Sequence, residues 1–376
     1  MSRCRVCGES LDGADRITIN PAPSGAQHFA RTAADARGRR IALEIVECRA
    51  CGLVQATNPP VDGYRRAISA AGVSGPMREH RTDQARRLGA VVGRTGARVA
   101  LVGCGNGYEL PLLAEAGFAP EGIEAGGAPA GYDGPWRVHD GYPDAGATLP
   151  GAPYDAFACY NFLEHAPEPR AFLTSIVRSL TPQGAGVVEV PNYDRQRREG
   201  RAADYVADHL SYFDAPALRT ALTLSGFTVL SLDEVRGGEN IEAFVRRRAP
   251  SDLAGHADLF ARARAAVDAF FARWRAAGTP AVAWGASHQA MTLLGGVADE
   301  NAPTAIIDSA AFKRGLFAPP AGIPVVAPST EAVRGAGAVL VIASGYEREI
   351  ARTLRHDLGF GGEVWTIRGH DLHRFD

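Results

Sequence analysis

Two short cysteine motifs near the N-terminus restrict the fold of the first 62 residues more than any other feature. Each motif reads Cys-x-x-Cys-Gly, and 40 residues lie between Cys7 of the first and Cys48 of the second. A knuckle of this kind places two thiolates on a tight turn, whose glycine permits a positive φ. Two knuckles supply four ligands for a tetrahedral zinc ion, namely Cys4, Cys7, Cys48 and Cys51. We therefore predict a structural zinc site in a small module over residues 1–62.

The expected compartment and the charge of the chain argue against other roles for the four cysteines and against several classes of function. Disulfide pairing of the four cysteines is disfavoured because Met1-Ser2-Arg3-Cys4 runs directly into polar residues, without a secretory signal. A catalytic zinc is disfavoured because four cysteines leave no open coordination position. The 40 basic residues balance 42 acidic ones, which argues against nucleic-acid binding. No stretch approaches the roughly 20 apolar residues of a membrane span. We expect a cytoplasmic protein.

Residues 63–248 alternate predicted strands and helices, and a glycine-rich turn follows the first buried strand. That strand is Arg98–Val102, and the turn is Gly103-Cys-Gly-Asn-Gly107. Such a turn lets a ligand approach the backbone at the start of a helix. The next predicted strand ends on Glu124, 19 residues after Gly105. A carboxylate there is placed to accept hydrogen bonds from a ribose diol. This pattern predicts a nucleotide-like cofactor, although dinucleotide-binding folds use a related turn.

The same segment resembles the class I methyltransferases that use S-adenosylmethionine. The resemblance rests on Val99–Gly107 as the first motif, Glu124 as the ribose-binding acid and Tyr154–His165 as the strand that closes the pocket. Leu180–Gly184 and Val187–Pro191 resemble the following turn and the fifth strand. The resemblance implies S-adenosylmethionine as the cofactor. The residues that it implies for cofactor binding are Gly103, Gly105, Asn106, Gly107, Glu124, Asn161, Glu164 and His165.

Residues 249–376 repeat the order of strand, turn, helix and strand. A predicted strand over 281–284 leads into a turn at Gly285, a second strand reaches Asp308, and a third covers 338–342. We therefore expect a second doubly wound domain with an anion site of its own. A nicotinamide site is a weaker alternative, because the turn at Gly285 lacks the full glycine triplet.

Taken together, the chain resembles bacterial C-methyltransferases that act on nucleotide-linked keto-deoxysugars. The resemblance rests on both knuckles, on the cofactor motifs and on three further stretches, Asp208–Phe213, Trp284–Gln289 and Asp308–Gly315. It implies an α/β fold with a zinc-ribbon-like module (1–62), a class I methyltransferase core (63–248) and a Rossmann-like C-terminal domain (249–376). The implied reaction is methylation of a carbon next to a ketone, in deoxysugar or natural-product biosynthesis, with a nucleotide-linked sugar as the small-molecule substrate.

Carbon becomes a nucleophile only after a proton α to a carbonyl is removed, and a histidine titrates in the right range for that task. The resemblance points to His209 as the base, with Asp208 and Tyr212 beside it. Asp208 stands where such enzymes more often carry glutamate. Val206 stands where they carry a tyrosine, and Tyr205 is one position away. The alternative is that His209 and Tyr212 pack a loop against the core.

Further residues are expected at the substrate. His80 opens a predicted helix and is either a lid or a solvated helix start. Ser287 and His288 either contact an anion or cap a helix, and Lys313 is the single lysine of the chain. The full set of expected substrate contacts is His80, Tyr205, Ser287, His288, Lys313 and Tyr346.

Two other functions stay open at this point. A non-sugar acceptor would use the unusual stretch Gly237–Asn240. A non-catalytic protein that binds S-adenosylmethionine or a nucleotide is the second, and the intact Gly103, Gly105, Gly107 and Glu124 argue against it. The two isolated cysteines, Cys104 and Cys159, are expected in the core as small apolar residues.

Overall fold

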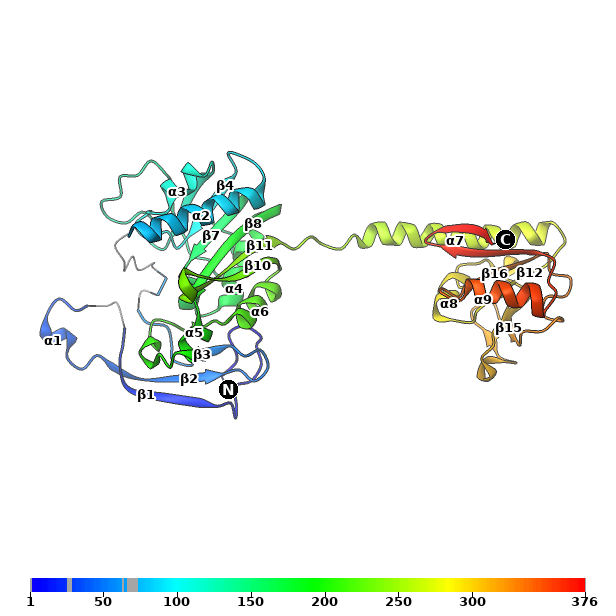
Figure 1. The fold of residues 1–376 in the computed structure, drawn as a ribbon, viewed down its shortest axis with the longest axis horizontal. Coiled ribbons are helices and arrows are strands. Elements are labelled where there is room, and N and C mark those ends of the chain that lie inside the picture. The colour runs from blue at the N-terminus through cyan, green and yellow to red at the C-terminus, as the bar shows by residue number, and fades with distance from the viewer. Residues whose placement is uncertain (1, 26–28, 63, 66–73, 376) are drawn as a thin grey trace. The chain divides into compact units, whose positions relative to one another are not determined.

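The chain folds into two compact units, Met1–Ala249 and Pro250–Asp376, in a computed structural model that describes residues 2–25, 29–62, 64–65 and 74–375. Figure 1 shows that both units are mixed α/β, which confirms the fold class expected from the sequence. The four knuckle cysteines and the methyltransferase-like segment belong to the same unit. Among the described residues, no helix combines the length and the apolar character that a membrane crossing requires.

The N-terminal cysteine module carries a four-stranded antiparallel sheet in the order β1-β2-β3-β9. Its strands are β1 (Arg16–Pro23), β2 (Arg40–Glu47), β3 (Val54–Ala56) and β9 (Ser211–Tyr212), with the short helix α1 (Ala33–Ala36) between the first two. The fourth strand comes from more than 150 positions further along the chain, directly after His209. The module predicted over residues 1–62 is thus completed by a strand from the methyltransferase-like segment.

A seven-stranded sheet forms the centre of the first unit, in the order β10-β11-β8-β7-β4-β5-β6. β8, β7, β4, β5 and β6 are parallel, whereas β11 is antiparallel to β8 and to β10. The strands are β4 (Arg98–Val102), β5 (Ala119–Glu124), β6 (Val138–Asp140), β7 (Tyr154–Tyr160), β8 (Leu180–Pro191), β10 (Phe227–Val235) and β11 (Asn240–Arg247). Parallel strands place their carboxyl ends, and the turns that follow them, at one edge of the sheet.

Helices cover both faces of this sheet (Figure 1). Apolar residues of α2 and α3 pack with those of β4 and β7 in one cluster, and residues of α4 and α6 pack on the other face. That second cluster also contains Cys4, Val6, Cys48 and Leu53 of the cysteine module. The helices are α2 (Gly75–Val92), α3 (Leu110–Glu115), α4 (Pro169–Arg178), α5 (Tyr193–Arg198) and α6 (Ala215–Leu224). The module and the methyltransferase-like fold therefore share one hydrophobic core.

Local sequence signals explain where α2 begins and ends. The Ser74 hydroxyl accepts the Met77 N–H at 3.3 Å, and a proline occupies the first turn, where its missing N–H costs no hydrogen bond. The helix stops at Gly93, whose φ of 75° is a left-handed conformation that suits glycine. The serine cap adds a turn that carries no core residue.

The C-terminal unit contains a second seven-stranded sheet, in the order β14-β15-β13-β12-β16-β17-β18. Its five central strands are parallel, and each edge strand is antiparallel to its neighbour. The elements are β12 (Ala281–Trp284), β13 (Ile306–Ile307), β14 (Phe317–Ala318), β15 (Ile323–Val326), β16 (Ala338–Val341), β17 (Glu363–Arg368), β18 (Asp371–Phe375), α7 (Leu253–Ala276), α8 (His288–Leu294) and α9 (Glu347–Arg352). The expected doubly wound domain is confirmed, with β12 at the point where the strand order reverses.

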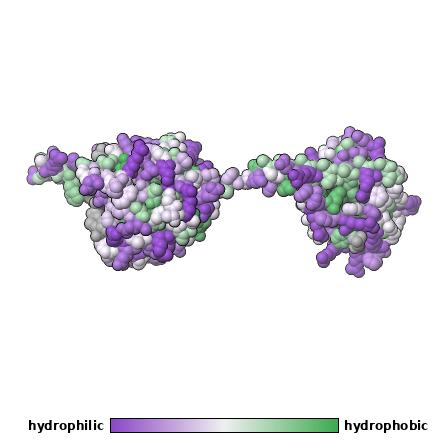
Figure 2. Space-filling view, turned by 90° about the horizontal axis from the view of Figure 1, so that it is seen from above, coloured by the Kyte–Doolittle hydropathy of each residue, from purple (hydrophilic) through white to green (hydrophobic). Residues whose placement is uncertain are grey.

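Surface hydropathy differs along α7. The buried residues of this helix begin only at Ala263, and they are Ala263, Val267, Phe270 and Phe271. Leu253, Leu259 and Phe260 of the first half are exposed. Figure 2 shows mostly hydrophilic residues on the visible face of each unit, interrupted by small hydrophobic areas.

Candidate active site

The four cysteines of the two knuckles lie together. The Sγ atoms of Cys4 and Cys51 are 3.6 Å apart, as are those of Cys7 and Cys48, and all four lie within 4.8 Å of one another. Both knuckles close in the same way, because the N–H of Gly8 donates to the Cys4 carbonyl and the N–H of Gly52 to the Cys48 carbonyl. Both glycines have a positive φ, 79° and 73°.

This cluster fits a tetrahedral zinc ion. A Zn–S distance of about 2.3 Å places tetrahedral sulfur ligands roughly 3.8 Å apart, close to the separations found here. None of the four cysteines forms a disulfide, and the two pairs that approach most closely each join one knuckle to the other. The donor set is closed, as a structural rather than a catalytic zinc site requires.

The turn after β4 and the acid at the end of β5 are in direct contact. The N–H of Gly105 donates to Glu124 Oε2 at 2.9 Å, and the side chain of Glu124 is buried. Gly105 has a φ of 51°, so the turn brings its amide toward the strand end. A backbone turn beside a buried carboxylate suits the ribose of S-adenosylmethionine, which accepts and donates hydrogen bonds through its hydroxyls. Asn106 Oδ1 accepts the Tyr108 N–H at 3.2 Å and holds the turn locally.

Two aromatic residues that the sequence did not single out lie against this turn. A Cβ added to Gly103 would meet the ring of Phe162 at 2.6 Å, and one added to Gly107 would meet Tyr132 at 2.7 Å. Glycine is therefore required at both positions by close packing as well as by backbone conformation. Tyr132 comes from the loop after β5, and no periodicity or motif distinguishes it in the sequence.

His165 and His209 lie side by side although 43 residues lie between them in the sequence. Their ring centroids are 4.9 Å apart and the rings are nearly perpendicular, at 78°. His165 ends the short 3₁₀ helix η1 (Leu163–His165), and its Nδ1 lies 2.8 Å from the Asp208 carbonyl oxygen. A carbonyl only accepts, so Nδ1 carries the hydrogen and Nε2 is the basic nitrogen. One carboxylate oxygen of Glu164 and one ring nitrogen each of His165 and His209 all lie within 4.8 Å of one another.

Burial controls protonation in this group. Burial raises the pKa of the Glu164 carboxyl to about 8, so this acid is mostly neutral at pH 7. Burial lowers the pKa of His165 as well. The pKa of His209 falls to about 3, first because its surroundings exclude water and then because the charge of His165 opposes a second one. Both imidazoles are therefore neutral at pH 7 and able to accept a proton.

The remaining residues of the predicted catalytic group hold the backbone around His209. The Tyr212 hydroxyl accepts the Val206 N–H and donates to the Val206 carbonyl, both at 3.0 Å. The Tyr205 and Tyr193 hydroxyls lie 3.1 Å apart, so Tyr193 joins the cluster without having been predicted. Asp208 is buried and presents its carbonyl to His165. Both hydrogen bonds of Tyr212 are thus made to the main chain of its own loop, in keeping with the interpretation that this residue packs the loop.

Asn161 lies where the site meets β11. Its φ is 46°, a conformation that asparagine tolerates better than most residues. Its Oδ1 accepts a hydrogen bond from Asn240 Nδ2 at 2.7 Å. The stretch Gly237–Asn240 thus reaches the end of β7 through Asn240.

His80 lies on α2 and is engaged by the sheet beneath it. Its Nε2 is 2.6 Å from Glu189 Oε2 on β8, and the same oxygen accepts from Arg81 at 2.6 Å and from Gln84 at 2.5 Å. Gln84 also donates to Glu242 at 2.8 Å. Burial alone would raise the pKa of Glu189, but the His80 hydrogen bond and the Arg81 charge lower it to about 2. These contacts anchor α2 by charge and hydrogen bonding.

The C-terminal unit repeats the contact between turn and acid. The Ala286 N–H, after Gly285, donates to Asp308 Oδ2 at 2.7 Å. Lys313 Nζ donates to the same carboxylate oxygen at 3.0 Å and to the Ala286 carbonyl at 2.8 Å. The single lysine therefore braces the turn from within. Ser287 caps α8 by accepting the Ala290 N–H at 3.2 Å. His288 and Tyr346 are exposed, at the start of α8 and before α9.

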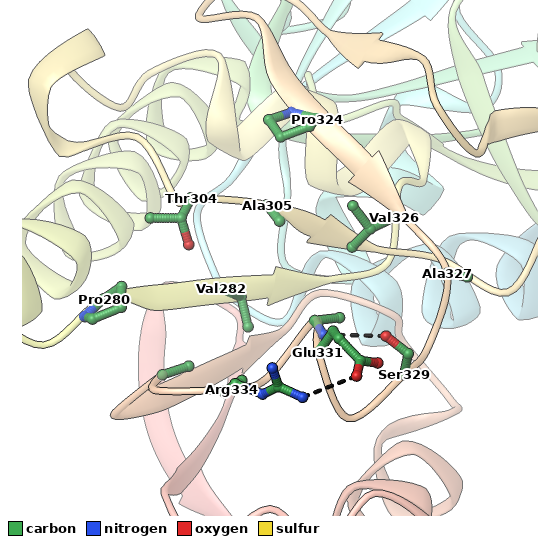
Figure 3. Close-up of a pocket in the computed structure, with 12 residues that line it drawn as sticks. Pro280, Val282, Thr304, Ala305, Pro324, Val326, Ala327, Ser329, Glu331 and Arg334 are labelled. Carbon is green, nitrogen blue, oxygen red and sulfur yellow. Dashed lines mark hydrogen bonds and ion pairs between the residues drawn. The ribbon is translucent and has the colours of Figure 1, made fainter.

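A separate pocket of about 430 Å³ lies elsewhere in this unit (Figure 3). Its apolar wall includes Val282 and Val326, and the Glu331–Arg334 ion pair at 2.9 Å lies on its rim. Pro280 and Thr304, which also line it, precede β12 and β13. The pocket thus includes the amino ends of these strands, whereas ligands of doubly wound folds bind at the carboxyl ends.

Comparison with known families gives two adjoining matches. Residues 77–232 match a family described as a methyltransferase domain, and residues 234–367 match one described as a C-methyltransferase C-terminal domain. Residues 77–232 therefore form a methyltransferase domain of the class that depends on S-adenosylmethionine, followed by a C-methyltransferase C-terminal domain. The knuckle cysteines Cys4, Cys7, Cys48 and Cys51 precede both matched regions.

Among curated proteins, the chain is similar to ubiquinone biosynthesis O-methyltransferases. It is 36% identical over 108 residues to that of Xylella fastidiosa (strain 9a5c), a region covering 26% of this chain and 43% of the relative. The enzyme of strain M23 is 35% identical over 111 residues, covering 27% and 44%. The chain thus spans less than half the length of the curated relatives that it matches.

Solved structures with similar folds include a SAM-dependent methyltransferase from Aquifex aeolicus. It is 17% identical, with a TM-score of 0.36, over 46% of this chain and 93% of that one. SAM-bound CalS10, an amino pentose methyltransferase from Micromonospora echinaspora, is 19% identical, with a TM-score of 0.35, over 45% and 91%. The fold of this chain is assigned from the strand order of its two seven-stranded sheets and not from these structures.

The substitution Glu189→Gln tests the anchoring of α2. Loss of the negative charge removes the closer ion-pair partner of the buried Arg81 and leaves only Glu109 at 3.9 Å, so we expect the free energy of unfolding to fall by about 3 kcal/mol at pH 7. Native-state hydrogen exchange in β7 and β8 measures this change. The exposed pair Arg78–Glu115 supplies the control, since Glu115→Gln is expected to cost less than about 1 kcal/mol.

The pH dependence of the same variant has a definite sign. A carboxylate whose pKa is lowered by folding stabilises the folded state above its unfolded pKa of about 4.3. The wild type loses this contribution as the pH falls from about 4.3 through 2. The difference between wild type and Glu189→Gln should therefore shrink over that interval, and a constant difference would contradict the assignment.

Proposed function

We propose that the protein is a SAM-dependent C-methyltransferase that methylates the enolisable carbon of a nucleotide-linked keto-deoxysugar. The observation that carries this proposal is the pair of neutral, part-buried histidines, His165 and His209, in a chain whose second matched region is a C-methyltransferase domain. S-adenosylmethionine, when bound, supplies an electrophilic methyl group on its sulfonium. Gly103, Gly105, Asn106, Gly107 and Glu124 would hold it.

The first task of the site is removal of a proton from carbon. An imidazole nitrogen of His209 accepts the proton α to the ketone, and the electron pair of the broken C–H bond stays on the substrate as an enolate. His209 is unprotonated at pH 7, but its lowered pKa also makes it a weaker base than an ordinary histidine. The enolate charge that develops nearby strengthens the imidazole as a base during the transfer.

Glu164 and His165 support this step in different ways. The neutral Glu164 adds no negative charge that would oppose formation of the enolate beside it. His165 is fixed by its bond to the Asp208 carbonyl, so its ring orients the neighbouring His209. Asp208 thus serves the base through its main chain, which explains how the site accepts a residue shorter than glutamate.

The C-terminal domain is proposed to bind the nucleotide part of the substrate. Its support is the turn at Gly285 at the carboxyl end of β12, the strand at the reversal point of the sheet. Ser287 and His288 follow this turn, and Lys313 keeps it in place through Asp308. Tyr346 presents an exposed ring after β16, suited to stacking on a base.

The four-cysteine cluster is proposed to hold a structural zinc ion. We expect one zinc per chain by elemental analysis, and expect Cys48→Ser to lose it together with several kcal/mol of stability, because binding and folding of such modules are coupled. Cys159→Ser supplies the control, since that buried cysteine lies outside the cluster. A wild-type protein without zinc that folds normally would contradict the proposal.

Solvent exchange at the substrate carbon tests the role of His209. In deuterated buffer with S-adenosylhomocysteine, wild type should incorporate deuterium next to the ketone of a thymidine-diphosphate-linked 4-keto-deoxysugar. His209→Asn should slow exchange by about 10²–10⁴-fold, because the proton acceptor is gone. Its affinity for S-adenosylmethionine, measured by calorimetry, should change less than about threefold. His356→Asn, at an exposed position of the other unit, is the control.

The pH profile adds an independent check. A base with an ordinary histidine pKa loses activity as it is protonated near pH 6.5, whereas His209 stays unprotonated down to about pH 3. Exchange by wild type should therefore show no acid limb near pH 6.5. Exchange that survives in His209→Asn would remove this residue from the reaction.

A further inference from the structure

The two segments that carry the histidines are tied to each other by the main chain. The Leu210 N–H donates to the Glu164 carbonyl at 2.8 Å, and His165 Nδ1 donates to the Asp208 carbonyl at 2.8 Å. These bonds fix the segment after β7 against the segment before β9. The distance between the two imidazoles therefore depends on what holds the two segments in place.

The cysteine module holds one segment through β9. Val54 and Gln55 of β3 pair with Tyr212 and Ser211, and the Ala56 N–H donates to the Leu210 carbonyl at 3.1 Å. The backbone that immediately follows His209 is thus part of the module's sheet.

The module holds the other segment through Arg5, which lies between the knuckle cysteines Cys4 and Cys7. The Arg5 guanidinium donates to the Pro167 carbonyl at 2.7 Å, only two residues after His165. It also donates to the carbonyls of Ala56 and Asn58, at 3.0 and 3.2 Å. One planar group therefore joins β3 to the His165 segment, and its several N–H donors in a fixed fork suit three carbonyls at once.

The second knuckle offers a natural comparison. Arg49 occupies the position after Cys48 that Arg5 occupies after Cys4. Its side chain is 67% exposed, and its nearest acidic partner is Asp15, at 3.6 Å. Arg5 is part-buried, and its main-chain N–H donates to Gln55 Oε1 at 3.0 Å. The two knuckles are alike around the metal-ligand positions, but only the first reaches the histidine segment with its arginine.

We infer that Arg5 is a positioning residue, which couples the cysteine module to the geometry of the His165–His209 pair. The module then has a role beyond stabilising its own fold. Arg5 holds the His165 segment, and the pairing of β9 with β3 holds the His209 segment. The consequence for catalysis rests on the function proposed above, whereas the coupling itself does not.

Substitution of Arg5 tests this inference in the full-length, zinc-loaded protein. Arg5→Met keeps the apolar stem and removes the donors, Arg5→Lys keeps the charge but not the fork, and Arg49→Met is the matched control. The first readout is the imidazole carbon-bound proton signals in NMR, assigned with His165→Asn and His209→Asn. We expect both signals to move in Arg5→Met, to move less in Arg5→Lys and to stay in place in Arg49→Met.

Three further measurements separate positioning from general damage. Zinc should remain at one per chain, and the affinity for S-adenosylmethionine should stay within about threefold of wild type. With substrate, kcat should fall by about 10–100-fold in Arg5→Met with little change in KM, since small misplacements of a reacting group have effects of that size. Arg5→Lys should recover part of the lost kcat.

Several results would overturn the inference. Histidine signals of Arg5→Met that coincide with those of Arg49→Met would show that the pair does not depend on Arg5. Loss of zinc in Arg5→Met alone would assign the residue to the knuckle instead. If Arg5→Met does not fold, Arg5→Lys decides by the same signals. Shifted signals in a protein without methyl transfer would leave the coupling intact and reject the proposed function.

Discussion

The parallel order of β8, β7, β4 and β5 is the constraint on which the candidate site depends. Because these strands point the same way, the Gly103–Gly107 turn, Glu124 and the Asn161–His165 segment all emerge at one edge of the sheet. The bond from Gly105 to Glu124 joins two of these loops directly. The C-terminal unit uses the same device, with Ala286 and Asp308 in the corresponding places. At the carboxyl edge of each sheet, a turn amide and a carboxylate are thus held together by a hydrogen bond.

His209 is the component that the parallel sheet does not position by itself. It lies between α5 and β9, outside the seven strands, and reaches the site because β9 joins the antiparallel sheet of the cysteine module. Its surroundings lower the pKa of the imidazole and keep it neutral at pH 7. We therefore propose that the cysteine module, by bracing this loop, contributes to the reaction through geometry.

The sequence predicts what depends on local pattern and motif, and misses what depends on distant pairing. β4 and β12 were predicted to the residue, since apolar runs ending in glycine turns mark them. Glu124 is singled out by its place at the end of a predicted strand together with the resemblance to class I methyltransferases, and Cys104 and Cys159 are buried as expected. The contact of His80 with Glu189 joins positions 109 apart, and β9 joins the module across an even longer separation. Lys313 donates to Asp308 and to the Ala286 carbonyl, partners that only the folded turn brings together. Arg5 looks the same as Arg49 in the sequence and differs only in its surroundings.

The most direct test of the account is the position of the transferred methyl group. Incubation with S-adenosylmethionine labelled with ¹³C in its methyl group and a nucleotide-linked 4-keto-deoxysugar, followed by NMR of the product, distinguishes carbon from oxygen as the acceptor. We predict a labelled methyl group bonded to the carbon next to the ketone, in place of a proton that this carbon has lost. A labelled methoxy signal, or a product that retains that proton, would contradict it.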